Sequence, residues 1–464
     1  MEWRLARMIR RRGAAAVLLA MLAACGGGGG SAGGGGDPPP PLQLATPGVS
    51  VIKLRSGATS WVALAEKARS PEIPTKPQRQ LLISQADGRS LRLSHLPPDG
   101  WSLLDFALHA SGEISLLLAS DRELRLQRLS AIGQPLRDQP FVDLQVATDA
   151  FVGDPLSGRD HQSLLPHYTR DAARLAAIGE DVALAFRSGR HAVVLHRLAY
   201  TATDGFAKQW RRLVEPGVFI GARFITSGTF DPFKSLDQQW RVALDADAQG
   251  RIAVAVSLHD TDLLDGHRQH FGEALDPAVA NGLLLSQFNG SGQRLGTALI
   301  DTRQRSELHA LRWVGDQVAV AGRVRTLQTP EGWDGFLALV PAGATAASAY
   351  RVLHADAGDV VFDVALRSDG RLLVAGSTGY TQNPAGASIS EDAKPLLGLL
   401  SADGQWQQRI TLVAGPRHNQ LRALASRADG SWLLGGMDNG PGTHSADANT
   451  ALLTADGYLR EQRL

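Results

Sequence analysis

The chain has 464 residues, of which 44% are hydrophobic and 20% are charged, a balance typical of a folded globular protein. Its formal charge is +1, but the first 24 residues hold five arginines and one glutamate, so the remainder carries a net charge of −3. A mildly acidic chain without a basic stripe lacks the charge that neutralises phosphates, so we expect no nucleic-acid partner.

The first element along the chain is an export signal. Residues 4–12 are rich in arginine, and residues 14–24 form an apolar stretch about half as long as the ~20 residues of a transmembrane helix. The sequence LAAC at residues 22–25 resembles the lipobox of bacterial lipoproteins. The resemblance implies cleavage before Cys25, a diacylglyceryl group on its thiol and acylation of its new amine. The alternative is an ordinary secretory signal with an incidental cysteine.

A tether follows the predicted lipidation site. Residues 26–36 are almost all glycine and form a flexible linker, and residues 37–41 form a stiffer Asp-Pro segment. The residue after the cysteine is Gly26 and not the aspartate typical of inner-membrane retention, so the resemblance implies the outer membrane, on its periplasmic or its surface side. Because Cys25 is the only cysteine, we expect no disulfide. The predicted parts are a signal peptide (1–24), a lipidated tether (25–42) and a folded domain (43–464).

The folded domain is a series of two alternating kinds of β-hairpin. The first kind has two apolar strands around a polar, glycine-containing turn, and its copies are 51–68, 105–121, 174–189, 242–260, 309–326, 363–379 and 422–440. The second kind alternates apolar and polar residues, and its copies are 80–96, 123–138, 192–213, 282–300, 335–353, 396–413 and 450–464. Tight turns are predicted at the Asp-Gly pairs that begin at 87, 369, 403, 429 and 456.

This alternation predicts an all-β, seven-bladed β-propeller. Apolar inner strands paired with half-exposed outer strands are what a propeller blade needs, and seven copies of each hairpin give seven blades. The segment SDGRLLVAG at 368–376 resembles the repeats of bacterial propeller proteins. Such repeats recur in secreted and lipid-anchored proteins. The alternatives are a ring of six or eight blades, or two stacked β-sandwiches.

The predicted topology puts the long insertions on one face. In four-stranded blades, the loops between the second and third strands lie on the same face as the links between blades. The insertions fall in those connections, at 147–173, 214–239, 259–281, 325–334 and 377–394. Long loops of this kind are typical of binding sites, and neutral drift is the alternative.

Two insertions contain candidate site residues. The segment HDTDLLDGHRQH supplies possible ligands for a metal ion at His259, His267 and His270. Contacts to a ligand or partner are expected from six residues, namely Phe219, Arg223, Phe230, Phe233, Asp262 and His267. A solvated polar loop and simple packing of the phenylalanines are the alternatives.

These features favour a lipid-anchored envelope protein, a monomer, that binds or scaffolds a protein or glycan through the insertion-bearing face. No catalytic residue is assigned, and no cofactor is expected apart from the lipid on Cys25 and a possible metal. The alternative is a hydrolase or lyase that acts on polysaccharide or peptidoglycan, for which His259, Asp262, His267 and Asp231 are the candidates. A further alternative is a quinone- or metal-dependent oxidoreductase.

Overall fold

The computed structural model describes residues 43–464 except for 48, 59, 68–77, 86–87, 121–122, 144–172, 188–192, 216–240, 259–266, 269, 277, 280–281, 327–331, 357, 380, 383–387, 390–392, 416–417 and 441–455. The predicted signal peptide, Cys25 and the tether therefore lie outside the described residues. Among the residues that are described, no helix has both the length and the apolar character that crossing a bilayer requires.

The described residues form thirty strands, of which twenty-eight make up seven four-stranded antiparallel sheets. The first sheet holds β2 (Val49–Ser56), β3 (Trp61–Lys67), β4 (Gln78–Ser84) and β5 (Leu91–His95). The second holds β6 (Ser102–Leu108), β7 (Ile114–Ala119), β8 (Leu124–Leu129) and β9 (Pro135–Phe141). The third holds β10 (Ala173–Ile178), β11 (Asp181–Arg187), β12 (Val193–Thr201) and β13 (Gly205–Glu215).

The remaining sheets repeat this order until the last one. The fourth holds β14 (Val242–Ala246), β15 (Ile252–Leu258), β16 (Gly282–Phe288) and β17 (Arg294–Asp301), and the fifth β18 (Ser306–Val314), β19 (Gln317–Arg325), β20 (Trp333–Pro341) and β21 (Ala349–Leu353). The sixth holds β22 (Val360–Leu366), β23 (Leu372–Thr378), β26 (Lys394–Leu400) and β27 (Trp406–Ile410), with β24 (Thr381–Gln382) and β25 (Ser388–Ile389) as a separate pair. The seventh holds β28 (His418–Ser426), β29 (Trp432–Gly440), β30 (Asp456–Gln462) and β1 (Gln43–Pro47).

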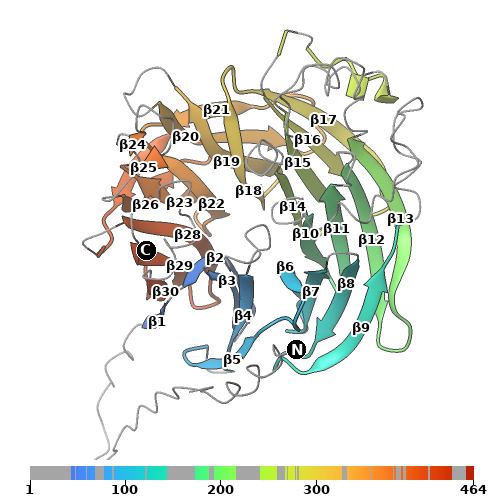
Figure 1. The fold of residues 1–464 in the computed structure, drawn as a ribbon. Helices are drawn as coiled ribbons and strands as arrows, with labels where there is room; N and C mark the ends of the chain where they lie inside the picture. The colour runs from blue at the N-terminus through green and yellow to red at the C-terminus, as the bar shows by residue number, and fades with distance from the viewer. Residues whose placement is uncertain are drawn as a thin grey trace, which may run out of the picture. The chain divides into compact units, whose positions relative to one another are not determined.

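The seven sheets surround a common centre as the blades of a propeller (Figure 1). The first strand of each blade is innermost, and these strands contact one another in sequence from β6 through β10, β14, β18 and β22 to β28, which contacts β2 of the first blade. The prediction of a seven-bladed β-propeller is therefore confirmed, and the alternatives of six blades, eight blades or stacked sandwiches are wrong.

The ring is closed by a strand exchange that the hairpin pattern did not predict. The outermost strand of the seventh blade is β1, which pairs antiparallel with β30 from Gln43 opposite Arg460 to Pro47 opposite Asp456. The predicted turn at Asp456 and Gly457 is wrong, because both residues pair inside β30 with β29. The seventh outer hairpin, 450–464, is thus replaced by one strand from each end of the domain; its residues 450–455 lie outside the described residues.

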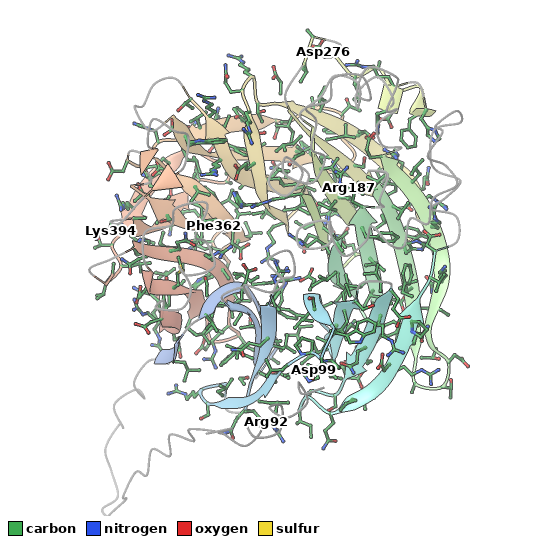
Figure 2. All side chains as sticks on the ribbon, viewed as in Figure 1. Arg92, Asp99, Arg187, Asp276, Phe362 and Lys394 are labelled. Atoms are coloured by element: carbon green, nitrogen blue, oxygen red, sulfur yellow. The ribbon has the colours of Figure 1, made fainter. Side chains whose placement is uncertain are left out.

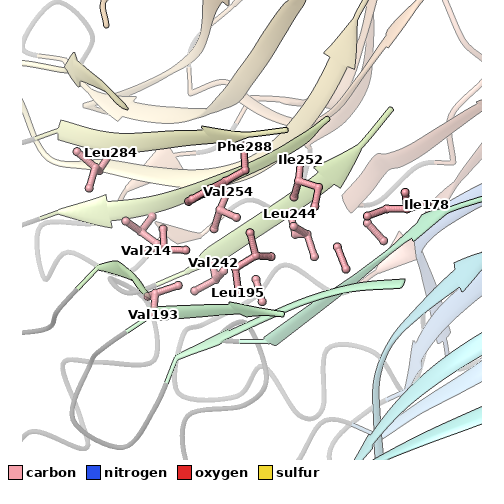
Figure 3. Packing of buried hydrophobic residues seen from close by; sticks show 14 of the residues in the cluster. Ile178, Val193, Leu195, Val214, Val242, Leu244, Ile252, Val254, Leu284 and Phe288 are labelled. Atoms are coloured by element: carbon pink, nitrogen blue, oxygen red, sulfur yellow. The ribbon is translucent and has the colours of Figure 1, made fainter. Parts of the chain in front are cut away.

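Side chains occupy the spaces between neighbouring blades (Figure 2), and the clusters buried there are apolar. The buried residues form seven clusters, and each cluster draws its members from two consecutive blades. Figure 3 shows the one between the third and fourth blades, where Leu195 and Val214 face Val242 and Val254. Inner strands are apolar on both faces because each face contacts a different blade, as predicted from the runs in the sequence.

The predicted Asp-Gly turns that begin at 369, 403 and 429 form as the residue types require. At the turn from β22 to β23, Gly370 has φ +82°, its N–H donates to Arg367 O at 3.1 Å, and the Asp369 carboxylate accepts the Arg371 N–H at 3.1 Å. Glycine tolerates this left-handed conformation and aspartate satisfies the turn's N–H groups, so the pair is well suited to the hairpin. The glycines at 88, 404 and 430 also have positive φ.

Gly376, the last glycine of the repeat segment SDGRLLVAG, has a packing role. Five innermost strands contain a bulge in their pairing with the second strand, for example between Val361 and Asp363. Gly376 on β23 lies opposite this bulge, and a Cβ there would come within 2.0 Å of Val360 O. Gly322 and Gly436 occupy matching positions in other blades, and a Cβ at either residue would lie 1.9 Å from a backbone oxygen. The bulge therefore excludes any side chain at these sites.

The insertions lie in the predicted connections. They occupy the links between β9 and β10 and between β13 and β14, and the loops between the second and third strands of blades four to six. The short turns are at the other end of the strands.

We predict that Gly376→Ala destabilises the fold by about 1–3 kcal/mol, because the β22–β23 pair must shift to admit the methyl group. Thermal unfolding followed by circular dichroism measures the effect as a lower melting temperature. The matched control is Gly57→Ala, where the nearest atom to the new Cβ is Ser60 Oγ at 3.6 Å. Equal melting temperatures for the two variants would contradict the packing role of Gly376.

Candidate functional site

The axis of the propeller contains a polar cavity of about 230 Å³. All seven blades contribute to its wall through their innermost strands or the residue just before them. One end of the cavity adjoins the insertion-bearing face, since Arg241 directly follows the link 216–240 and Glu66 and Arg79 flank the loop between β3 and β4. The cavity is the candidate functional site.

Three aspartates on innermost strands connect consecutive blades around this cavity. Asp105 on β6 accepts the N–H of Leu175 at 2.9 Å, which joins blades two and three. Asp245 on β14 accepts the N–H of Trp313 at 2.8 Å, and Asp363 on β22 accepts the N–H of Leu424 at 3.0 Å. Each carboxylate therefore accepts a backbone N–H group from the innermost strand of the next blade.

Lys53 on β2 bridges three blades. Its ammonium group donates to Asp105 Oδ1 at 2.6 Å, to Phe106 O at 2.8 Å and to Leu175 O at 3.3 Å. Burial lowers the pKa of Lys53 to about 8, against the opposing attraction of Asp105. With three acceptors around three N–H groups, Lys53 holds structure in the cavity wall and is poorly placed to act as a nucleophile.

Arg312 and Arg55 form a second charged group in the cavity wall. Arg312 makes a bidentate ion pair with Asp363, with Nε–Oδ1 at 3.0 Å and Nη2–Oδ2 at 3.1 Å. Arg55 and Arg312 each lie 4.0 Å from Asp245. Burial lowers the pKa of Arg55 to about 10, and the positive charge of Arg312 adds to the effect. The two guanidinium groups therefore crowd one carboxylate.

The end of the cavity that adjoins the insertions is also cationic. Arg79 donates to Glu66 Oε2 at 3.0 Å and to Leu104 O at 2.6 Å. Arg241 contacts the ring of His309, and burial together with Arg241 lowers the pKa of His309 to about 3, so this imidazole is neutral. The guanidinium of Arg422 lies over the ring of Phe362, 5.1 Å from its centroid, and Figure 2 labels Phe362.

The cavity wall has an excess of positive charge. Three carboxylates line it, Glu66, Asp105 and Asp363. Its seven cationic side chains are Lys53, Arg55, Arg79, Arg174, Arg241, Arg312 and Arg422. Even with Asp245 added from the adjoining wall, the described cations outnumber the carboxylates. A low-dielectric cavity with this balance attracts an anion.

Of the predicted site residues, His267 is fully buried between two carboxylates. Its Nδ1 lies 2.8 Å from Glu215 Oε2 and its Nε2 lies 2.9 Å from Glu273 Oε2. Thr297 Oγ1 donates to the other oxygen of Glu273 at 2.9 Å. Burial opposes the charged form, but the hydrogen bonds to Glu215 and Glu273 outweigh it and raise the pKa of His267. Both ring nitrogens donate here, so a metal ion would have to displace a carboxylate.

The other predicted residues are not brought together by the described structure. His270 is exposed and contacts Phe271 edge-on, with ring centroids 4.7 Å apart. Outside the described residues lie Phe219, Arg223, Phe230, Phe233, Asp231, His259 and Asp262. The metal and partner sites assigned to these loops therefore stay predictions.

The sequence analysis missed the cavity residues. Their signal is a charged residue between two apolar residues of an inner strand, as with Lys53 in VSVIKLRS or Arg312 in SELHALRWV. Such a residue cannot face a neighbouring blade without a large desolvation cost, so it must face the axis.

No protein-family model and no curated protein matches this chain. Many solved structures share its fold at low identity. The β-propeller domain of the Trilobed protease from Pyrococcus furiosus is 8% identical, with 88% of this chain and 98% of that domain covered and a TM-score of 0.43. The structure titled "YCF48 bound to D1 peptide" is 10% identical, covering 92% and 96%, with a TM-score of 0.47.

An acylaminoacyl peptidase from Pyrococcus horikoshii is 7% identical with a TM-score of 0.43, and 89% of this chain aligns with it. This chain spans only about half, 52%, of that peptidase. These likenesses concern the propeller fold.

We predict that the contribution of His267 to stability falls as the pH rises. Its pKa is raised in the folded state, so the protonated ring stabilises the fold fully below its ordinary value of about 6.5, and this contribution is lost as the pH rises through the folded pKa. The melting-temperature difference between the wild type and His267→Gln should be largest near pH ~6 and shrink toward pH ~9. His270→Gln, at an exposed histidine, is the control. A difference that is independent of pH would contradict the charged triad.

Proposed function

We propose that this chain is a binding protein whose axial cavity, together with the insertion-bearing face around it, takes up an anionic group of a protein or glycan partner. The observation that carries the proposal is the balance of seven cations against three carboxylates in the cavity wall. Burial lowers the pKa of Arg55 and of Lys53, with a smaller contribution from neighbouring positive charge, and a ligand carboxylate or phosphate there would stabilise their charged forms.

The size and position of the cavity support this proposal. A volume of about 230 Å³ accommodates one acidic side chain or one charged sugar unit, whereas a longer polymer would extend over the face outside. The five insertions connect strands at that face, and we propose that they supply the additional contact area that a macromolecular partner needs.

Binding is favoured over the alternative of a hydrolase or lyase. General acid–base catalysis needs a carboxyl group that exchanges its proton near neutral pH. Each carboxylate that lines the cavity is instead held by a cation: Glu66 by Arg79, Asp105 by Lys53 and Asp363 by Arg312. These pairs give the carboxylates a structural role in a cationic binding site.

We further propose that the propeller is anchored to the bacterial outer membrane by lipid on Cys25. The LAAC segment, the arginine-rich leader and the glycine–proline tether support this placement. Several acyl chains on one residue give stable anchoring where a single chain gives weak binding.

Arg422→Gln and Arg55→Gln should each weaken anion binding about tenfold, because a hydrogen bond to a charged group contributes about 1.5–3 kcal/mol. Calorimetry with an acidic oligogalacturonide, an oligoglutamate peptide and a neutral oligosaccharide of equal length identifies the partner class. Affinity for the anionic probe should also fall as salt rises from about 0.05 M to about 0.3 M.

The control for these variants is Arg92→Gln, at an exposed arginine on β5 that Figure 2 labels away from the cavity. If this substitution weakens binding as much as Arg422→Gln, or if the neutral probe binds as tightly as the charged ones, the cavity is not the anion site.

Metabolic labelling with an alkyne analogue of palmitate tests the anchor. We expect label on the wild type and none on Cys25→Ser, because the lipid is attached through that residue. Ser31→Ala, in the same tether, should keep the label. A wild-type chain that is exported but unlabelled would rule out the anchor and leave the cavity proposal unaffected.

A further inference from the structure

A second polar cluster lies at the junction of the fifth and sixth blades, away from the axial cavity. It consists of Asp334 near the start of β20, and of His354 and Asp359 in the link from β21 to β22. One ligand atom from each of the three residues lies within 4.8 Å of the others. The loop before β20 and the link after β21 both belong to the insertion-bearing face.

Burial of the two carboxylates is nearly complete. The side chain of Asp334 is 2% exposed, Asp359 is 1% exposed, and the side chain of His354 is 60% exposed. The cluster therefore has two carboxyl groups in the interior and one imidazole that is exposed to solvent.

Asp359 has an oxygen that the described protein does not satisfy. Its Oδ2 accepts the N–H groups of Ala355 at 2.6 Å and Asp356 at 3.1 Å, which fixes the direction of the carboxylate. Its Oδ1 is buried and makes no hydrogen bond of ordinary geometry within the described residues. Burial raises the pKa of Asp359, and among the described side chains the donor that opposes this effect is the hydroxyl of Thr378. A buried carboxylate oxygen with only one poorly placed donor is costly, and a cation would satisfy it.

The surrounding contacts orient the other two residues. Thr326 Oγ1 donates to Asp334 Oδ2, and His354 Nδ1 lies 2.9 Å from Asp334 Oδ1. The imidazole of His354 is exposed and screened by water, so it stabilises the second buried carboxylate, Asp359, only weakly. Supporting hydrogen bonds of this kind are typical of the shell around a metal ion.

We propose that Asp334, His354 and Asp359 bind one divalent transition-metal ion, with Zn²⁺ as the best match. Two carboxylate oxygens and one imidazole nitrogen form the kind of three-residue set that binds zinc and leaves a fourth position for water or for a ligand group. Calcium prefers six to eight oxygen ligands and magnesium an octahedron of oxygens, neither of which this set supplies. On binding, the imidazole nitrogen that meets the metal gives up its proton to solvent.

Isothermal titration of the purified full-length chain with ZnCl₂, and separately with MnCl₂, CaCl₂ and MgCl₂, tests the site. We expect one saturable zinc site, weaker binding of manganese, and none of calcium or magnesium in the same range. Zinc should raise the melting temperature of the wild type, because it binds only the folded state.

His354→Ala and Asp359→Asn should each abolish this zinc site. His354 is exposed, so His354→Ala keeps the fold, and circular dichroism checks both variants. Thr326→Val removes only the hydrogen bond to Asp334 and should weaken zinc binding about 10–100-fold. The matched controls are Asp356→Asn, an exposed acid in the same link, and His270→Ala, an exposed histidine of the fourth blade.

Three results would overturn the proposal. They are the absence of a saturable zinc site in the wild type, zinc binding that survives in both His354→Ala and Asp359→Asn, and loss of binding in His270→Ala alone. The last result would place the metal in the insertion 259–281. The proposal is independent of anion binding in the axial cavity, which Arg422→Gln tests separately.

Discussion

The apolar contact between consecutive sheets is the constraint on which the rest of this structure depends. Every blade buries one face against the blade before it and the other against the blade after it, so no sheet has a face that is left to solvent. Both faces of every sheet are covered only when the last blade packs against the first. The cluster between the seventh and first blades, with Val51 and Leu54 against Leu433 and Leu459, completes the circle.

A closed ring leaves one region that apolar packing cannot fill. Side chains that point toward the axis have no opposing sheet, so polar residues occur there at little packing cost. The chain uses this region in two ways. Asp105, Asp245 and Asp363 connect blades through backbone N–H groups, and arginines in excess of those needs give the wall its positive charge. The innermost strands therefore supply both the hydrogen bonds that join the blades and the positive charges that attract a ligand.

Local patterns in the sequence were sufficient for most of the fold. The segment 363–379 contains two apolar runs around Asp369-Gly370, and it forms β22, a turn and β23. The same reasoning failed at 450–464, where Asp456-Gly457 imitates a turn. The strand that pairs there, β1, is at the other end of the domain, and no local pattern reports a partner so far away.

The candidate sites were less accessible from sequence for the same reason. His267 was recognised as a special histidine, but its partner Glu215 is 52 residues earlier, so its buried ion-pair role was not visible. Arg312 and Asp363 are 51 residues apart in sequence and meet only because the innermost strands of consecutive blades, β18 and β22, lie side by side. The sequence analysis did not single out Asp334, His354 and Asp359, because their spacing matches no ligand motif. They come together only because the link from β21 to β22 returns past the start of β20.

The exchange of strands in the seventh blade has a consequence for the order of folding. Six blades are each made from one continuous stretch of chain, so each is able to assemble as soon as its own residues are available. The seventh needs Gln43–Pro47 from the beginning and Asp456–Gln462 from the end, so its last ladder has the greatest loop-closure cost in the molecule. We therefore expect the pairing of β1 with β30 to form late, and until it forms, β30 exposes an unpaired strand edge to chaperones and proteases.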